Sequence, residues 1–315
     1  MAVRGHRAAA LLLIGISMLP AAACSADSTQ PSKAPKVVFV VANTQLNFSR
    51  EMQAGFRAGV EQVSGVKLQI VGPDIVDGAA EVKLFQKAAG AEPGGVSVFT
   101  LSPDLFVDPL SAATAQGLPM IAVDNPPPSG SGVTLFVGND NTELGKKLAD
   151  VVIDRLPTGA KGTVVLGTSS PGVPVLDQRV AGMRAEFARR TPGVQVLGAF
   201  DTKQDVDANL AAWGILVKAN PHALAFLGTG DADGWNLASI RSHDNAQWLA
   251  GAFDLDPRAL KAVKAGDLLL VSPEHFVKGA LAGRLQASHA LDGTDLPKGW
   301  VYTPGLAVTP ENIDA

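Results

Sequence analysis

The chain has 315 residues, of which 46% are hydrophobic and 18% charged, and its formal net charge is -4 at pH 7. This length exceeds one ordinary core and suits two α/β domains, and the apolar fraction excludes a disordered chain. The single cysteine excludes a disulfide framework and a multi-cysteine zinc site, and five scattered histidines make a histidine-based metal centre unexpected. The negative charge and the low aromatic content argue against a nucleic-acid partner.

Residues 1–23 have the features of a secretory signal peptide. Arg4 and Arg7 make its start positive, and an apolar stretch of about twelve residues follows at 8–19. This stretch is too short to span a bilayer comfortably. Three alanines then lead to Cys24. The arrangement resembles the bacterial lipobox, which implies cleavage before Cys24 and a lipid on its thiol. The alternative is that Cys24 is a buried free cysteine.

The next segment, residues 24–35, is polar and has no apolar period, so we expect a flexible tether. The lipobox resemblance implies an exported protein that is lipid-anchored to the outer face of the bacterial cytoplasmic membrane, at the cell surface or in the periplasm. A diacylated cysteine supplies two chains, which suffices for stable anchoring.

Beyond the tether, apolar runs alternate with segments of helical period. The run at 37–41 is continuously apolar, as in a strand buried on both faces, and a helix with one apolar face is expected from about residue 49. Further strands are expected at 67–71, 96–101, 119–123, 135–138, 163–166, 194–199, 223–227, 248–253 and 268–271. Further helices are expected at 81–89, 109–116, 142–155, 175–190, 204–218, 232–242, 257–265 and 276–291, before a tail at 300–312.

This alternation predicts right-handed βαβ units and an α/β fold with two doubly wound, Rossmann-like parallel sheets. Ligands of such sheets bind at the carboxyl ends of the strands, near the point where the strand order reverses. Side chains that can hydrogen-bond to hydroxyl groups follow many of the expected strands. These candidate binding residues are Asn43, Asn47, Asp124, Asn125, Asp231, Asp254, Glu274 and His275.

Two phenylalanines near the same strand ends, Phe48 and Phe200, offer apolar faces that suit the C–H side of a sugar or polyol. The alternative for an Asp or Asn before a helix is a capping role, and it is strongest for Asp140 and Asn141. Several such residues at one rim nevertheless favour a polar pocket.

Arg179 lies early in an expected helix, on the same face as Val175, Met183 and Phe187. Because a buried unpaired charge is very costly, its guanidinium needs a partner. That partner is either an aspartate across the cleft or the oxygen atoms of a ligand. We favour the ligand, and the two can coexist.

The mature chain, about residues 36–313, resembles a periplasmic sugar-binding protein of the ribose-binding type, whose fold is shared with the effector domains of LacI-like repressors. Each matching segment is weak alone, but their order and spacing extend over the whole chain. They are Asn47 and Phe48 with Gly55, 121–124, 138–141 with Gly145, 178–183, Gly230 and Asp231, 251–254, and 303–306.

The resemblance implies two lobes joined by three hinge crossings, near 139–141, 272–274 and 299–303, with the ligand in a cleft between the lobes. The expected lobes are 36–139 plus 274–299 for the amino-terminal lobe, and 140–273 plus 300–315 for the carboxy-terminal lobe.

The resemblance also implies ligand roles by position. Phe48 matches the stacking aromatic residue of the family, and Asp124 matches the aspartate that binds hydroxyls from the first lobe. Arg179 and Asp254 match ligand residues of the second lobe, and Phe200 lies near the aromatic residue of that lobe.

The chain departs from the family pattern at several contacts. Asn125 stands where an arginine often follows the first-lobe aspartate, Gly230 stands where an asparagine is frequent, and 273–275 replace a late Gln-x-Pro. These changes remove pentose-ring contacts, so a sugar alcohol or another small polyol fits at least as well as ribose. Trp235 either fills the vacated space or packs under its helix, and His275 either binds the ligand or caps the last helix.

The function implied is capture without chemistry. The protein is expected to be the extracytoplasmic solute-binding component of an ABC importer, closing around a small neutral sugar or sugar alcohol and presenting it to a membrane permease. The alternative is a sensory lipoprotein of the same fold that presents its ligand to a membrane receptor. We expect a monomer. We also expect that the protein is not an enzyme and has no cofactor, because the dinucleotide, nucleophile-elbow and calcium-loop motifs are incomplete.

Overall fold

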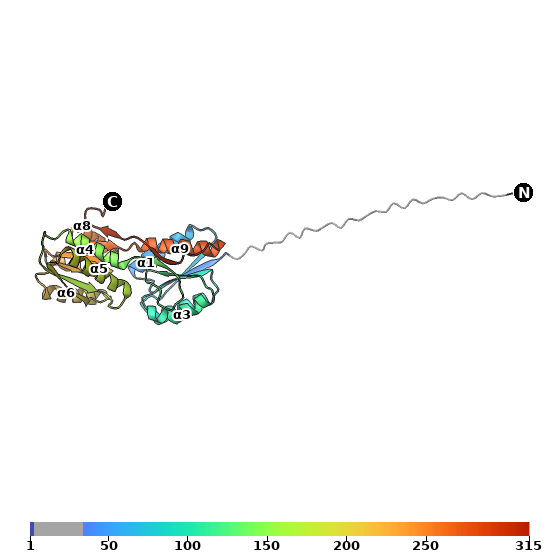
Figure 1. Ribbon diagram of the computed structural model, residues 1–315, viewed down its shortest axis with the longest axis horizontal. Helices are drawn as coiled ribbons and strands as arrows, with labels where there is room; N and C mark the ends of the chain where they lie inside the picture. Colours follow the sequence, from blue (N-terminus) through green and yellow to red (C-terminus); the bar gives the residue numbers. More distant parts are fainter. Residues whose placement is uncertain (3–33, 315) are drawn as a thin grey trace. The chain divides into compact units, whose positions relative to one another are not determined.

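The computed structural model of the protein describes residues 1–2 and 34–314 (Figure 1). The expected signal peptide beyond its first two residues, the expected lipidation site Cys24 and the tether up to residue 33 lie outside the described residues. Within the described part of the chain, no helix has both the length and the apolar character needed to cross a membrane. The residues from Ala34 onward form one compact unit.

The strands of this unit form two six-stranded sheets. The first sheet contains β1 (Lys36–Val41), β2 (Lys67–Val71), β3 (Gly95–Phe99), β4 (Met120–Val123), β5 (Leu135–Gly138) and β11 (Gly299–Tyr302). The second sheet contains β6 (Gly162–Thr168), β7 (Val194–Asp201), β8 (Ala225–Leu227), β9 (Leu249–Phe253), β10 (Leu269–Ser272) and β12 (Leu306–Val308).

The two sheets have equivalent strand orders, β11-β5-β4-β3-β1-β2 and β12-β10-β9-β8-β6-β7. Paired strands run parallel, except that β12 is antiparallel to β10. In each sheet the strand order reverses at the first strand, β1 or β6, and such a reversal leaves a crevice at the carboxyl ends. The predicted α/β fold with two doubly wound parallel sheets is confirmed.

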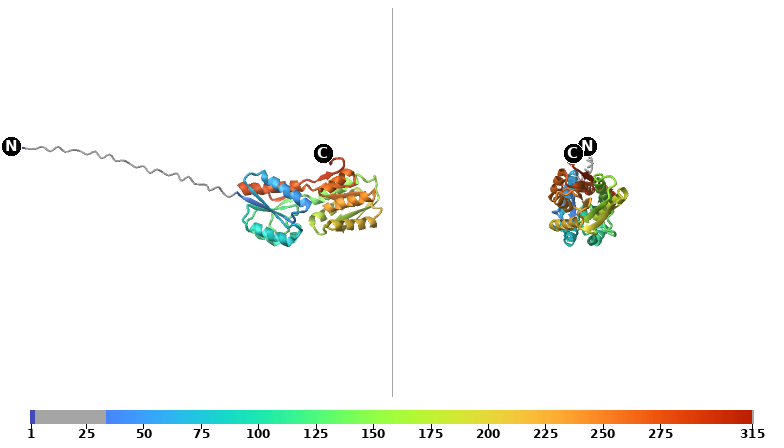
Figure 2. Two further views of the ribbon diagram at one scale, coloured as in Figure 1. Left: turned by 180° about the vertical axis from the view of Figure 1, so that it is seen from behind. Right: turned by 90° about the vertical axis from the view of Figure 1, so that its left-hand side faces the viewer.

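Helices cover both faces of each sheet (Figure 2). Those of the first sheet are α1 (Asn47–Glu61), α2 (Gly78–Ala89), α3 (Pro103–Ala115) and α9 (His275–Asp292). Those of the second sheet are α4 (Asn141–Ile153), α5 (Pro174–Arg190), α6 (Val206–Ala219), α7 (Asp231–His243) and α8 (Pro257–Ala265).

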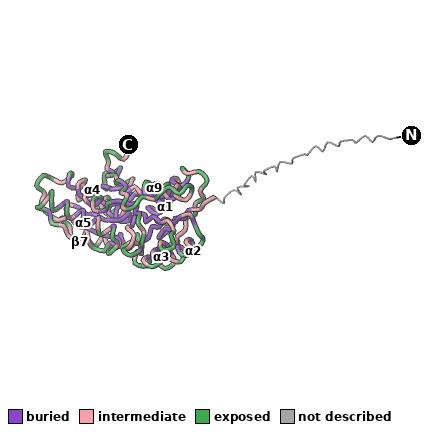
Figure 3. The backbone as a smooth tube through the Cα atoms, turned by 45° about the vertical axis from the view of Figure 1, so that its right-hand side comes forward, coloured by how far each residue is buried: buried purple, intermediate pink, exposed green. Residues whose placement is uncertain are grey.

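The inner strand β1 shows why a buried parallel strand has a continuous apolar sequence. Val37, Phe39 and Val41 pack in the core cluster that α1 and α9 cover, whereas Val38 and Val40 pack in the cluster that α2 and α3 cover. All five side chains are fully buried, in the interior that Figure 3 shows in purple. Neither face of the strand reaches water, so neither face needs polar residues.

Two helix pairs pack so closely that only glycine fits at their contacts. α1 packs against α9, and α4 packs against α5. A Cβ atom at Gly279 would overlap the carbonyl oxygen of Met52, and a Cβ at Gly182 would overlap that of Thr142. The backbones of each pair are therefore in direct contact, with no layer of side chains between them.

The chain passes between the two sheets at 139–140, 273–274 and 303–305. The first and third of these crossings are joined, because Asn139 Nδ2 donates hydrogen bonds to the carbonyl oxygens of Thr303 and Pro304, both at 3.0 Å. β11 places residues 299–302 in the first sheet.

β11 and β12 were not predicted from the sequence, and α3 begins earlier than predicted. The two strands are four and three residues long, too short to give a clear pattern. α3 begins at Pro103 and contains Pro109, which was expected to begin it. Proline usually ends or breaks a helix when it lies inside one, so the pattern favoured the later start.

Candidate functional site

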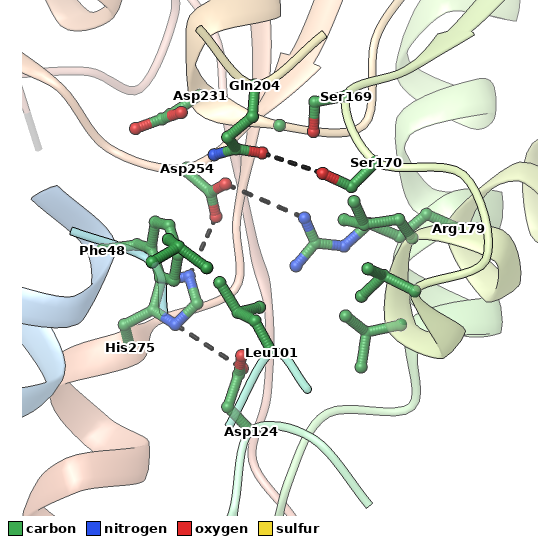
Figure 4. A pocket seen from close by; sticks show the side chains of 15 residues that line it. Phe48, Leu101, Asp124, Ser169, Ser170, Arg179, Gln204, Asp231, Asp254 and His275 are labelled. Carbon is green, nitrogen blue, oxygen red and sulfur yellow. Dashed lines mark hydrogen bonds and ion pairs between the residues drawn. The ribbon is translucent and has the colours of Figure 1, made fainter. Parts of the chain in front are cut away.

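A cavity of about 240 Å³ lies where residues of both sheets meet (Figure 4). This volume is many times what one water molecule needs, so the cavity suits one small solute. It is lined by Phe48, Val76, Leu101, Asp124, Ser169, Ser170, Val173, Val175, Leu176, Arg179, Gln204, Gly230, Asp231, Asp254 and His275.

Six of the eleven residues predicted to bind ligand lie in this lining. Two of them follow strands β4 and β9 directly, and the others lie near the N-termini of α1, α5, α7 and α9. The carboxyl ends of parallel strands meet at one edge of a sheet, which is why residues so distant in sequence come together. The six are Phe48, Asp124, Arg179, Asp231, Asp254 and His275.

Three predicted asparagines lie outside the lining, with their side chains on backbone groups. Asn43 donates to the carbonyl of Asp74 at 2.9 Å and accepts from two backbone N–H groups of the β1–α1 connection. Asn125 Nδ2 donates to the carbonyl of Thr100 at 2.7 Å. Asn47 Nδ2 donates to the carbonyl of Leu255, which follows a strand of the second sheet.

The other two predicted residues, Phe200 and Glu274, also lie outside the lining. Phe200 is on β7 and 41% exposed, and Glu274 precedes α9 with a left-handed backbone, φ 53°. Trp235 is likewise outside the lining, and the Arg258 guanidinium lies 3.6 Å from the centroid of its ring system.

Nine lining residues were not among those predicted to bind ligand. Ser169 and Ser170 follow β6 and Gln204 follows β7, so a complete survey of strand ends would have found them. The aliphatic lining residues, such as Val76 and Leu101, gave no polar signal that separates them from core residues.

Asp124 and Asp254 occupy equivalent positions, directly after β4 and β9. Their backbones are left-handed, with φ of 66° and 73°. Their N–H groups donate to the carbonyls of Val137, at 2.9 Å, and Val271, at 3.1 Å. A left-handed conformation costs a residue with a side chain about 1–2 kcal/mol, and such strain gathers at functional sites. The fold therefore aims both carboxylates at the expense of local backbone stability.

Four buried side chains form a continuous network between these two positions. The Lys278 ammonium donates to Asp124 Oδ1. His275 lies between the carboxylates, with Nε2 2.9 Å from Asp254 Oδ1 and Nδ1 3.6 Å from Asp124 Oδ1 (Figure 4). Because an ionised carboxylate only accepts hydrogen bonds, Nε2 donates to Asp254. The imidazole thus links a strand end of the first sheet to one of the second.

The cations of this network keep both carboxyl groups ionised. Burial favours a raised pKa for Asp124, but Lys278 and then His275 outweigh it and lower the pKa to about 2. Burial acts in the same way on Asp254, and Arg179 together with the hydrogen bond from His275 lowers its pKa. Burial lowers the pKa of Lys278, and the charge of Asp124 opposes that shift.

Arg179 contacts an aspartate and other protein groups, all from the second sheet and its helices, and its binding to a ligand stays a prediction. Its Nη1 donates to the carbonyl of Thr229 at 2.7 Å and lies 3.8 Å from Asp254 Oδ2, and its Nε donates to Asn141 Oδ1 at 3.0 Å. The guanidinium also lies 4.5 Å from the ring centroid of Phe253. Arg179 is therefore fixed by protein groups and still borders the cavity.

Asp231 is the lining carboxyl group without a basic partner. Its Oδ1 accepts a hydrogen bond from the N–H of Ala232 at 2.7 Å, and no lysine, arginine or histidine among the described residues lies within salt-bridge distance. Burial, and next the charge of Asp254, raise the pKa of Asp231 to about 7. This carboxyl is available to donors of a bound solute.

Among residues 1–2 and 34–314, no group of three or more His, Cys, Asp or Glu side chains is placed to hold a metal ion. The acidic residues of the lining lie among basic and neutral hydrogen-bond donors. Such an arrangement suits a solute that both donates and accepts hydrogen bonds.

Comparisons with known proteins agree with this architecture. A family model described as a periplasmic binding protein domain matches residues 37–290. No curated protein gives a significant match. Among solved structures, a solute-binding protein from Burkholderia graminis in complex with D-arabinose is 22% identical, with a TM-score of 0.81 over 89% of this chain and 97% of that one. A periplasmic ribose ABC transporter protein from Conexibacter woesei is 24% identical, with a TM-score of 0.79 over 90% and 95%.

Proposed function

The chain belongs to the periplasmic binding protein family, and from this premise we propose that it is the solute-binding component of an ABC importer for a small sugar or sugar alcohol. The protein binds its solute without chemical change. Its partner is a permease in the cytoplasmic membrane, and the protein acts as a monomer.

The observation that carries the proposal is the cavity at the strand ends of both sheets. Asp124, Asp254 and Arg179 present charged groups there, which neighbouring side chains and the backbone carbonyl of Thr229 hold in place. Hydrogen bonds between charged groups and neutral hydroxyls contribute about 1.5–3 kcal/mol each, which is enough to discriminate among sugars. Solved proteins of similar fold, with bound D-arabinose and D-allose, support the solute class.

The mechanism we propose is closure about the three crossings at 139–140, 273–274 and 303–305. We assign 36–139 and 274–302 to one lobe and the remaining described residues from 140 onward to the other. A solute that bonds to Asp124 of one lobe and Arg179 of the other gains most in the closed arrangement. Binding therefore shifts the population towards closure, and the permease receives the closed form.

We further propose that the protein is exported and held at the membrane by lipid on Cys24, with 24–35 as the tether. The apolar stretch at 8–19 and the single cysteine support this. In cells, wild-type protein is expected in the membrane fraction and the Cys24→Ser variant in the soluble fraction. Equal membrane retention of the two would contradict lipid anchoring through this residue.

The experiment that tests solute binding is a thermal-shift screen of the purified protein across pentoses, hexoses, tetritols and pentitols. A ligand at a hundred times its dissociation constant stabilises a protein by about 2.7 kcal/mol, which gives a clear shift. Arg179→Met is expected to remove the shift, and Arg184→Met, on the same helix but outside the cavity lining, is the control. An unchanged shift in Arg179→Met would refute the assignment of the site, and no shift with any compound would refute the solute class.

Small-angle scattering tests the closure step separately. The radius of gyration is expected to fall when the compound that gives the largest thermal shift is added. Tight binding with no compaction would contradict closure and leave solute binding in place.

A further inference from the structure

The cavity wall on the side of the first sheet is mostly apolar. Its lining residues on that side are Phe48, Val76, Leu101, Asp124 and His275. The two polar groups are partly engaged, because Asp124 Oδ1 accepts from Lys278 and His275 Nε2 donates to Asp254. Among the described residues His275 Nδ1 has no hydrogen-bond partner, so the polar contacts on this side are few and the other three lining residues are apolar. The first sheet therefore offers a solute mainly hydrocarbon contacts.

A second group of aliphatic side chains completes this surface from the other sheet. Val173, Val175 and Leu176 come from the β6–α5 connection and the first turn of α5. Val175 is 4% exposed, so its side chain is fixed by packing and cannot turn away from the cavity. We call Val76, Leu101, Val173, Val175 and Leu176 the aliphatic wall.

Further polar groups gather on the opposite part of the lining, where Ser170 donates to Gln204 Oε1 at 3.2 Å. Ser169, Gln204 and Asp231 lie at the carboxyl ends of β6, β7 and β8. Figure 4 shows Ser169, Ser170, Gln204 and Asp231 together on one side of Asp254, and Asp124 and Leu101 on the other. The lining is thus divided into a polar part and an aliphatic part.

A fully hydroxylated sugar does not match this division. Its C–H face can pack on Phe48, but hydroxyl groups project from every edge of its ring, so the edge that meets the aliphatic wall carries a hydroxyl without a hydrogen-bond partner. An unpartnered buried hydroxyl weakens binding about 5- to 150-fold, which converts to about 1–3 kcal/mol. A hydrogen atom or an alkyl group in that place removes the penalty and adds apolar contact.

We infer that the solute is an amphipathic carbohydrate, a deoxy sugar or an O-methyl sugar, whose hydroxylated edge meets Asp231 and its neighbours and whose apolar edge meets the aliphatic wall. This inference rests on the proposed function and narrows its solute class. Val76 is 47% exposed, so an O-methyl group on that side extends towards solvent without enlarging the cavity.

The test is calorimetric titration with matched pairs of sugars that differ by one hydroxyl. The pairs are D-galactose and D-fucose, L-mannose and L-rhamnose, D-ribose and 2-deoxy-D-ribose, and D-glucose and methyl α-D-glucoside. The tightest binder of the panel is expected to be a deoxy or methyl member, at least fivefold tighter than its hydroxylated partner. If the tightest binder is fully hydroxylated, the inference is overturned and the proposed function stands. If no member binds but a compound of the thermal-shift screen does, the inference is overturned and the proposed function stands.

Variants of the aliphatic wall locate the preference. Val173→Thr places a hydroxyl in nearly the same volume and is expected to reduce the preference for the deoxy or methyl member at least threefold, as is Leu101→Asn. Val206→Thr, on an exposed residue of α6 outside the lining, is the matched control and should leave the preference unchanged. A preference that persists unchanged in both wall variants would overturn the assignment.

Discussion

Lys278 supports the site although it lies outside the cavity lining, and its removal gives the sharpest test of the buried network. Lys278 is 0% exposed and its partner Asp124 has an 8% exposed side chain, so neither charge can turn to water. Lys278→Met keeps the length of the side chain and removes the charge. Removing one partner of a buried ion pair costs about 3–5 kcal/mol, because the other charge stays buried and uncompensated.

The double variant Lys278→Met/Asp124→Asn separates charge from packing. It contains neither charge, so we expect it to recover at least half of the free energy of unfolding that Lys278→Met loses. The measurement is urea unfolding at pH 7, followed by circular dichroism. Lys83→Met, on the exposed face of α2, is the control and should lie within about 0.5 kcal/mol of the wild type.

The pH dependence of stability gives an independent test of the ion pair between Lys278 and Asp124. The pKa of Asp124 is lowered from 3.8 to about 2, so the unfolded chain binds more protons between these values and stability rises with pH there. At about 1.4 kcal/mol for each pKa unit, the rise is about 2 kcal/mol. In Lys278→Met, burial is no longer opposed by the ammonium, and the rise should shrink or reverse. A single variant as stable as the wild type, or a double variant no better than the single one, would refute this reasoning.

Three further predictions concern the cavity and the helix contacts. Arg179→Lys keeps the charge but loses the geometry of the hydrogen bonds to Thr229 and Asn141. Its affinity for the best sugar of the thermal-shift screen, measured by calorimetry, should therefore fall at least tenfold. Unchanged affinity would contradict a role of Arg179 in solute binding. Burial raises the pKa of Asp231 to about 7, so the contribution of Asp231 to stability falls as pH rises from about 4 to 7. Asp231→Asn should flatten the plot of melting temperature against pH over this range. An unchanged slope would contradict the raised pKa. In urea unfolding, Gly279→Ala should lower the free energy of unfolding by about 2 kcal/mol or more. Gly214→Ala is the control, because its position in α6 has open space, and it should raise that free energy by up to about 1 kcal/mol. Equal effects would contradict the close packing of α1 on α9.

The fold was largely predictable because buried parallel strands and amphipathic helices produce strong patterns. The run at 37–41 is apolar on both faces, and the structure places it between β3 and β2 of the first sheet. β11 and β12 could not be predicted in this way, since they are stabilised by pairing with β5 and β10 rather than by their own sequence.

The strand-end rule brought Asp124 and Asp254 into one site, but it could not separate groups that face a cavity from groups that shape a turn. Asn43 follows β1 as Asp124 follows β4, yet its side chain is occupied by the backbone of its own connection. Lys278 was missed because a lysine on a helix is usually exposed. Its place one turn after His275 acquires meaning only when α9 is seen against Asp124.

The glycine contacts between α1 and α9 have a mechanical consequence. Two helices whose backbones touch cannot shear past one another, because there is no intervening side chain that could change rotamer to permit slippage. His275 and Lys278, both at the start of α9, can therefore travel only with the first sheet as a rigid body. A spectroscopic label at an exposed site further along α9, such as Leu291, would accordingly report rotation of the entire lobe rather than local rearrangement of the helix.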